Sequence, residues 1–181
     1  MKGETTYYRR IQVILELSGA RKPRLAEEFI QGIVRRSPPN FVYHRWDAKR
    51  QEIVPQCSEP AVRRAFNLAA QLGLVDAESA GLTTQGSEAA DPNRFGTVLR
   101  RRVRSYLQQA GCSVAKLEDA SLQMLQARPI QLPTAEELYV ALYASGAVNP
   151  SMSEFSTLLR LLAASDGIKI VRRHLFLPSN A

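Results

Sequence analysis

The sequence predicts a mainly α-helical protein with small β-hairpins, built from two related units in tandem. Three observations support this fold class. Apolar residues recur at helical spacing along most of the 181 residues. Short strand-like runs follow a helical pattern in each half of the chain. One pattern of residues also occurs twice, about 92 residues apart. We therefore expect one unit at residues 1–92 and a second at residues 93–181.

The repeat consists of three segments that recur in the same order. Residues 9–19 match 101–111 and residues 24–33 match 116–125, both at an offset of 92, whereas residues 68–74 match 162–168 at an offset of 94. Each match alone is weak, because apolar helices resemble one another by chance. Three ordered matches with nearly constant spacing indicate a duplication, in which the stretch between the second and third matches has diverged.

The first half begins with two predicted helices. The first spans residues 7–17, where apolar residues from Ile11 to Leu15 fall on one helical face. The second spans residues 24–35 and ends before Pro38, because a proline disfavours the helical conformation of the residue that precedes it.

The next segment, residues 40–55, fits two structures. Residues 41–43 can pair with residues 51–54 as a hairpin that turns at residues 47–50. Alternatively, Asn40 can cap a helix. Because the matching region of the second copy has a helical pattern, we favour the helix.

A third helix of the first unit begins at a Ser-Glu-Pro sequence, residues 58–60. The serine supplies a capping hydroxyl, the acid lies in the first turn, and the proline stands where no amide donor is needed. The helix is expected to run to about Leu72. Residues 74–76 and 81–83 are then expected to form two brief strands.

The second half contains the same kinds of start and stop signals. Asp91-Pro92 opens a basic linking helix at residues 93–111. The later elements follow in order: a helix at 114–126; a helix opened by the capping box of Thr134 and Glu137 and ending near Ser145; a helix capped by Ser153 and ended by Asp166-Gly167; and a hairpin of 168–171 with 174–177.

Residues 61–75 and 82–86 resemble the winged helix-turn-helix superfamily. In that superfamily the recognition helix ends in a Leu-Gly-Leu corner, here residues 72–74, and a Leu-Thr-x-x-Gly step, here residues 82–86, often opens the next helix. Residues 155–177 resemble the same pattern. The resemblance implies two tandem winged-helix-like units, each with a third helix that enters the major groove and a wing that reaches neighbouring phosphates.

The resemblance makes the polar face of each third helix a candidate DNA contact. Asparagine and glutamine can pair with adenine, and arginine with guanine. In the first unit this face carries Arg63, Arg64, Asn67 and Gln71. In the second unit it carries Ser156, Thr157 and Arg160, and the wing would add Lys169, Arg172, Arg173 and His174. A solvated helix face and a soluble hairpin tip are the competing interpretations.

The charge of the chain is concentrated in one segment. The formal net charge is +7, and 19 of the 24 basic residues are arginines, which suit phosphate and base-edge recognition. Residues 1–92 hold 13 basic and 11 acidic side chains, residues 93–111 hold five arginines and no acid, and residues 112–181 hold six of each. The linking helix therefore offers further candidate contacts: Arg100, Arg101 and Arg104, in a cluster with Arg102. Ion pairs with Glu27 and Glu28 are the alternative.

These features predict a non-enzymatic protein that binds double-stranded DNA, as a regulator or as the DNA-engaging subunit of a larger complex. The alternative is a protein–protein adaptor, because the second unit holds more apolar side chains than one small core is expected to use. These candidate partner-binding residues are Leu138, Tyr139, Leu142, Tyr143 and Leu161. Binding of single strands or RNA is a third possibility, in which aromatic residues stack on bases. Packing in the core or at an interface is the competing interpretation of these residues, which are Tyr7, Tyr8, Tyr43 and Trp46.

The sequence lacks the motifs of several other functional classes. It contains no phosphate-binding loop, dinucleotide fingerprint or nucleophile elbow. Neither His44 nor His174 has a metal-ligand partner at helical spacing, so no cofactor or metal is expected. No apolar run reaches the roughly 18 residues of a membrane helix. Cys57 and Cys112 are expected to be buried thiols, and a disulfide between them is the alternative. A cytoplasmic or nucleoid-associated location follows.

Overall fold

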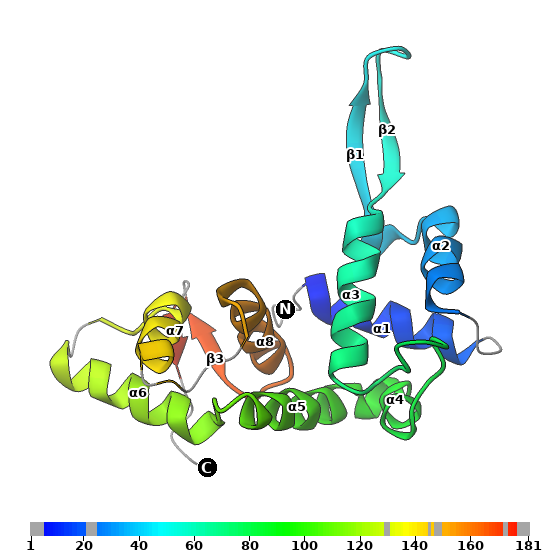
Figure 1. Ribbon diagram of the computed structural model, residues 1–181. Coiled ribbons are helices and arrows are strands. Elements are labelled where there is room, and N and C mark those ends of the chain that lie inside the picture. Colours follow the sequence, from blue (N-terminus) through cyan, green and yellow to red (C-terminus); the bar gives the residue numbers. More distant parts are fainter. Residues whose placement is uncertain are drawn as a thin grey trace. The chain divides into compact units, whose positions relative to one another are not determined.

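The computed structural model describes residues 6–20, 25–128, 131–144, 146, 150–171 and 174–176. The described chain is mainly helical, with small antiparallel two-stranded sheets (Figure 1). It divides into two compact units, Thr6–Phe95 and Gly96–Ala181. The division lies close to the boundary of 92/93 drawn from the sequence, and it falls inside a continuous helix. No helix in the described ranges is both long and apolar enough to cross a bilayer.

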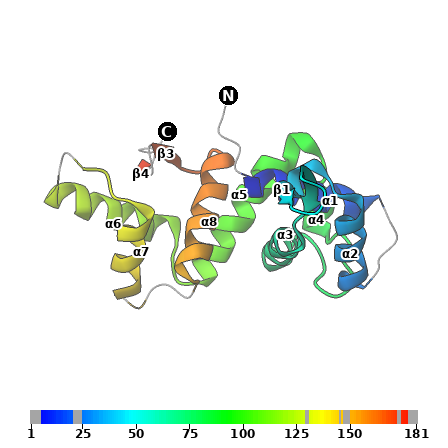
Figure 2. The same cartoon turned by 90° about the horizontal axis from the view of Figure 1, so that it is seen from above.

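In the N-terminal unit, two helices pack against a third. The helices of this unit are α1 (Thr6–Gly19), α2 (Ala26–Arg36), α3 (Glu59–Gln71) and α4 (Thr84–Ala89). Both α1 and α2 contact α3, and Figure 2 looks nearly along the α3 axis, with α2 beside it. The core between them contains Ile11, Ile14, Leu15, Phe29, Ile33, Val62, Ala65, Phe66 and Ala69. The three helices predicted for this half are therefore confirmed, with bounds shifted by one to two residues.

Between α2 and α3 the chain forms a hairpin, so the helix favoured at residues 40–55 was wrong. A short 3-10 turn, η1 (Pro39–Phe41), leads into β1 (Val42–Asp47), which pairs with β2 (Glu52–Cys57). β-Branched and aromatic residues along both strands favour this structure. The carboxylate of Asp47 accepts hydrogen bonds from the amides of Lys49 and Arg50 and so closes the turn.

The corner after α3 holds the N-terminal unit's last elements in place. Ser58 caps α3, as predicted, by accepting a hydrogen bond from the Ala61 amide. Two short strands were expected after the helix, but the structure has a single β-bridge between Val75 and Leu82. Thr83 then caps α4 and also donates a hydrogen bond to the carbonyl oxygen of Gly73 at 2.7 Å.

The C-terminal unit is a second helical assembly. Its elements are α5 (Pro92–Gln109), of which the part from Gly96 belongs to this unit, then α6 (Val114–Ala127), α7 (Ala135–Ala144), α8 (Met152–Ala164), β3 (Lys169–Val171) and β4 (His174–Phe176). Helix α7 contacts both α6 and α8, and it lies between them in Figure 2. The hydroxyl of Tyr106 in α5 donates a hydrogen bond of 2.7 Å to Glu154 in α8.

The helix starts of this unit follow local capping chemistry. Thr134 and Glu137 form the predicted capping box, in which each side chain bonds the backbone amide of the other. The cap of α8 is Ser151, not Ser153 as predicted, because the Ser151 hydroxyl accepts the Glu154 amide. The strands β3 and β4 confirm the predicted C-terminal hairpin, but its turn at Arg172 and Arg173 lies outside the described residues.

The repeat is clearest between α3 and α8. Their caps, Ser58 and Ser151, are 93 residues apart, and their left-handed corner residues, Gly73 (φ 66°) and Asp166 (φ 59°), share this offset. The buried sets also match at 93: Val62, Ala65, Phe66, Leu68 and Ala69 against Phe155, Leu158, Leu159, Leu161 and Leu162. The expected offset of 94 was wrong by one, because it aligned the glycines instead of the left-handed positions.

The other two matches have different outcomes. The first holds, since Ile11 and Leu15 of α1 and their counterparts Val103 and Leu107 of α5 are all buried. The second fails. Leu25 precedes α2 and is 67% exposed, whereas its supposed counterpart Leu117 lies inside α6 and is buried. The two units therefore share their first helix, the matched helices α3 and α8 and the corner that follows these. They differ before the matched helices, where a hairpin joins α2 to α3 and helix α7 lies between α6 and α8.

Candidate nucleic-acid interface

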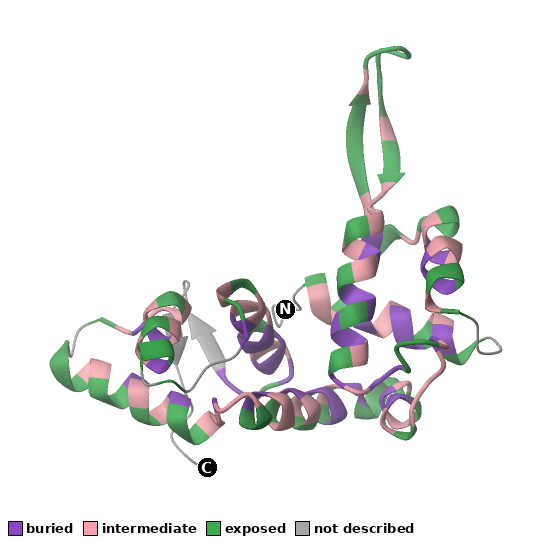
Figure 3. Ribbon diagram, viewed as in Figure 1, coloured by how far each residue is buried: buried purple, intermediate pink, exposed green. Residues whose placement is uncertain are grey.

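Helix α3 exposes a stripe of polar side chains. Arg64, Asn67 and Gln71 are spaced three and four residues apart, so they fall on one side of the helix. All three are exposed, while the opposite side of α3 is buried against α1 and α2 (Figure 3). We call these three residues the α3 stripe. It offers amide and guanidinium groups, which can bind base edges or phosphates.

Arg63, which was expected to belong to this contact surface, is engaged inside the unit. Its guanidinium donates hydrogen bonds to both carboxylate oxygens of Glu27, at 2.7 and 2.9 Å, and to Glu59 at 2.8 Å. Such two-pronged pairing suits the planar fork of arginine. Arg63 is therefore the arginine that pairs with Glu27 within the N-terminal unit. Arg63 ties α3 to α2 instead of presenting its charge to a ligand.

The Arg63 hydrogen bonds, with a further one from Gln31, hold the pKa of Glu27 at about 2, below its ordinary 4.5. A carboxylate whose pKa is lowered by folding stabilises the folded protein at pH values above its pKa in the unfolded chain. That stabilisation is lost as the pH falls through its pKa in the folded protein. We expect wild type to be more stable than Glu27→Gln at pH 7, and the gap to close between pH 4.5 and 2. Urea unfolding at several pH values measures this, and a gap that does not change with pH would contradict the account.

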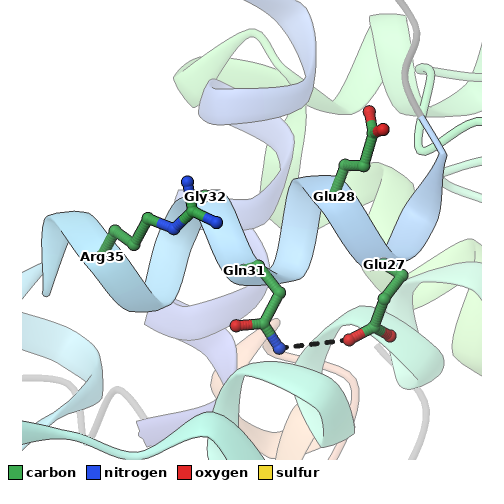
Figure 4. A pocket seen from close by; sticks show the side chains of 5 residues that line it. All are labelled: Glu27, Glu28, Gln31, Gly32 and Arg35. Atoms are coloured by element: carbon green, nitrogen blue, oxygen red, sulfur yellow. Dashed lines mark hydrogen bonds between the residues drawn. The ribbon is translucent and has the colours of Figure 1, made fainter.

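A shallow hollow runs along the outer side of α2, beside the Glu27 network. Figure 4 shows the five residues that line it: Glu27, Glu28, Gln31, Gly32 and Arg35. Its two carboxylates disfavour a phosphate group, and the amide of Gln31 donates a hydrogen bond to Glu27. We therefore leave this hollow out of the candidate interface.

The β1–β2 hairpin adds basic side chains that the sequence did not single out as a DNA contact, beside aromatic ones that it considered only for single-stranded bases. Arg45, Lys49 and Arg50 are exposed, and so are Tyr43 and Trp46. The hairpin enters α3 directly, because β2 ends one residue before the cap of the helix. The mixture of basic and aromatic residues at 42–57 was the feature of the sequence that could have indicated this surface. It was overlooked because a helix was favoured there.

The arginines of α5 differ in their exposure. Arg101 and Arg104 are exposed, whereas Arg100 is half-buried. The stem of Arg100 packs near the corner after α8, since a Cβ added at Gly167 would lie 3.4 Å from its Cγ. Its Nε atom is buried and bonds no other described group. Arg104 and Arg101 are therefore the better placed candidates for phosphate contact, and Arg100 has a packing role.

The outer side of α8 has fewer polar groups than the α3 stripe. At the offset of 93, Arg160 matches Asn67, Thr157 matches Arg64, and an alanine replaces Gln71. Arg160 is exposed, and the hydroxyl of Thr157 is bonded to the Ser153 carbonyl oxygen. The side chains expected on the wing, those of Lys169, Arg172, Arg173 and His174, lie outside the described part of the structure.

The predicted partner-binding surface is largely core. Leu138, Leu142 and Leu161 are buried, so the expectation that they form a surface was wrong. Tyr139 is half-buried, and its hydroxyl donates a hydrogen bond to the carbonyl oxygen of Pro150. Only Tyr143 of the five is largely exposed, at 65%. The sequence overestimated the apolar surface because the packing of α7 on α8 uses most of it.

The described residues contain no group of three or more His, Cys, Asp or Glu side chains that could hold a metal ion. Both cysteines are free thiols. Burial raises the pKa of Cys112 to about 11, which keeps it protonated and unreactive at neutral pH.

Comparison of the chain with models of protein families, with curated proteins and with solved structures finds no match. Its function is therefore inferred from its own residues and their geometry.

Proposed function

We propose that this chain is a non-enzymatic protein that binds double-stranded DNA, chiefly through its N-terminal unit. The observation that carries the proposal is the α3 stripe: Arg64, Asn67 and Gln71 project from one side of a helix whose other side is buried. An α-helix fits the major groove, and these three residue types are the ones that pair with guanine and adenine edges. The resemblance of this segment to winged helix-turn-helix proteins supports the same role for α3.

The charge distribution supports contact with a polyanion. The chain carries a net charge of +7, and the segment 93–111 holds five arginines and no acid. Exposed Arg101 and Arg104 in α5 and Arg160 in α8 supply further phosphate contacts. Phosphate contacts of this kind position a protein on DNA, and base contacts add specificity. Such a protein acts as a regulator or as the DNA-engaging subunit of a larger complex, and no cofactor is required.

The proposal is tested by a salt titration with three labelled probes of one sequence: duplex DNA, single-stranded DNA and RNA. We expect micromolar or tighter binding of the duplex at low salt, weakening as salt rises, because bound arginines release counterions. Preference for an unpaired probe would instead favour single-strand recognition.

Adaptor function is the second candidate, and one observation favours it. Val140 and Tyr143 of α7 are 61% and 65% exposed, and Leu122 of α6 is 57% exposed. Large apolar side chains at the surface often mark a protein interface. A partner protein that copurifies with wild type and is lost from Val140→Ser/Tyr143→Ser, together with absence of DNA binding, would select this function.

A further inference from the structure

The β1–β2 hairpin of the N-terminal unit has no buried residue in either strand. Every residue of both strands is exposed or half-buried (Figure 3). Trp46 and Ile53 are 59% and 65% exposed, and they face each other directly across the two strands. A two-stranded ribbon alone is marginally stable in water. An exposed tryptophan–isoleucine pair near its tip therefore gains from being covered.

The charges around this apolar pair favour an anionic partner. The hairpin carries two acids, Asp47 and Glu52, and Asp47 closes the turn. A guanidinium nitrogen of Arg50 lies 3.9 Å from a carboxylate oxygen of each acid. Arg45 and Lys49 are exposed, and neither forms an ion pair with another described residue. The apolar pair is thus flanked by positive charge that the unit itself leaves uncompensated. A duplex offers phosphates to such a tip, and it offers apolar base faces where a base step is unstacked.

The hairpin is also joined firmly to the helix that carries the α3 stripe. The Ser58 amide donates a hydrogen bond of 2.8 Å to the Phe41 carbonyl oxygen, which closes the base of the hairpin at the first residue before α3. The hairpin extends from this end of α3, away from the core (Figure 1). Strands of six residues reach roughly 17 Å, which is about twice the depth of roughly 8 Å of either groove of B-DNA.

We infer that the hairpin tip is a wedge for duplex DNA, in which Trp46 and Ile53 lie against a base step and Arg45 and Lys49 bind the adjoining phosphates. Apolar side chains inserted between base steps unstack them partly and bend the duplex. This inference rests on the proposed DNA binding and assigns it a second contact, separate from the α3 stripe.

Trp46 is the single tryptophan of the chain, so its fluorescence reports on the tip alone. A duplex labelled at one end is titrated with the protein, and its anisotropy reports binding while Trp46 emission and acrylamide quenching report coverage of the wedge. We expect binding to lower both the emission of Trp46 and its accessibility to acrylamide. Trp46→Thr should weaken binding about tenfold. Tyr43→Thr, on the opposite face of the same strand, should change it less than about twofold.

The variant Ile53→Thr keeps the tryptophan, so the emission and quenching of Trp46 in the free variant show whether the hairpin remains folded. If the duplex binds while Trp46 emission and quenching stay those of the free protein, the wedge is wrong and the proposed function stands. If no duplex binds, both are wrong. A shift in Trp46 emission that depends on protein concentration, without any effect of DNA, would mean that a second copy covers the tip and would overturn the wedge.

Discussion

Replacing Arg64, Asn67 and Gln71 together by alanine is expected to weaken duplex binding about 100-fold at low salt. Each lost base or phosphate contact costs about 1 kcal/mol or more, and three such losses correspond to about two orders of magnitude in affinity. The three side chains are exposed, so their removal leaves the core of the N-terminal unit intact. Fluorescence anisotropy with a labelled duplex measures the change.

The matched control is Arg94→Ala, which removes one positive charge from the same unit. Arg94 is exposed in the first turn of α5 and lies 3.8 Å from Asp91. We expect this variant to lose less than about threefold in affinity, because charge alone acts weakly through salt solution. An equal loss from Arg94→Ala and Arg64→Ala would mean that net charge, and not the α3 stripe, determines binding.

The variant Gly86→Ala is expected to lower the free energy of unfolding by about 3 kcal/mol. Gly86 is buried in α4, and a Cβ at this position would overlap the carbonyl oxygen of Leu74. That backbone cannot easily move, because the Thr83 hydroxyl bonds the carbonyl oxygens of both Gly73 and Leu74. Urea unfolding followed by circular dichroism measures the loss. Unchanged stability would contradict the close packing of this corner.

Gly32→Ala is the matched glycine control. Gly32 lies in the interior of α2, and an added Cβ would have no heavy atom within 4 Å. Alanine loses less backbone entropy than glycine when a helix forms, so this variant should be more stable by about 0.5–1 kcal/mol. Changes of opposite sign in the free energy of unfolding for Gly32→Ala and Gly86→Ala would separate the effect of helix propensity from that of steric exclusion.

Local signals in the sequence predicted most of the helices. Ser58, Thr134 and Asp91-Pro92 mark real helix starts, because a cap depends only on residues within one turn. The prediction of a helix for the segment 40–55 was wrong for a different reason. The aromatic and β-branched residues of this segment indicated strands, but the repeat suggested a helix, and the two units differ at this place. A repeat predicts shared elements well only where the residues themselves have stayed alike.

The candidate interface was predictable in part. Helical spacing alone places Arg64, Asn67 and Gln71 on the side opposite the buried face of α3, and the structure has them exposed. The engagement of Arg63 was not predictable, because Glu27 is 36 residues away and meets it only when α2 packs on α3.

The partner surface was overestimated for a related reason. The number of apolar residues is known from the sequence, but how many of them are buried in the core depends on packing. Leu138 and Leu161 are fully buried, at 0% exposure each, while their neighbour Tyr143 is not.

The central claim is that the N-terminal unit binds duplex DNA through charged and polar side chains on α3. The most direct test is the slope of log affinity against log salt concentration for wild type and Arg64→Ala on one duplex. The account predicts linear weakening with salt and a slope that is shallower by about 0.9 in the variant, because one arginine that neutralises a phosphate is gone. Binding that is absent at low salt, or whose salt dependence is the same in both proteins, would contradict it.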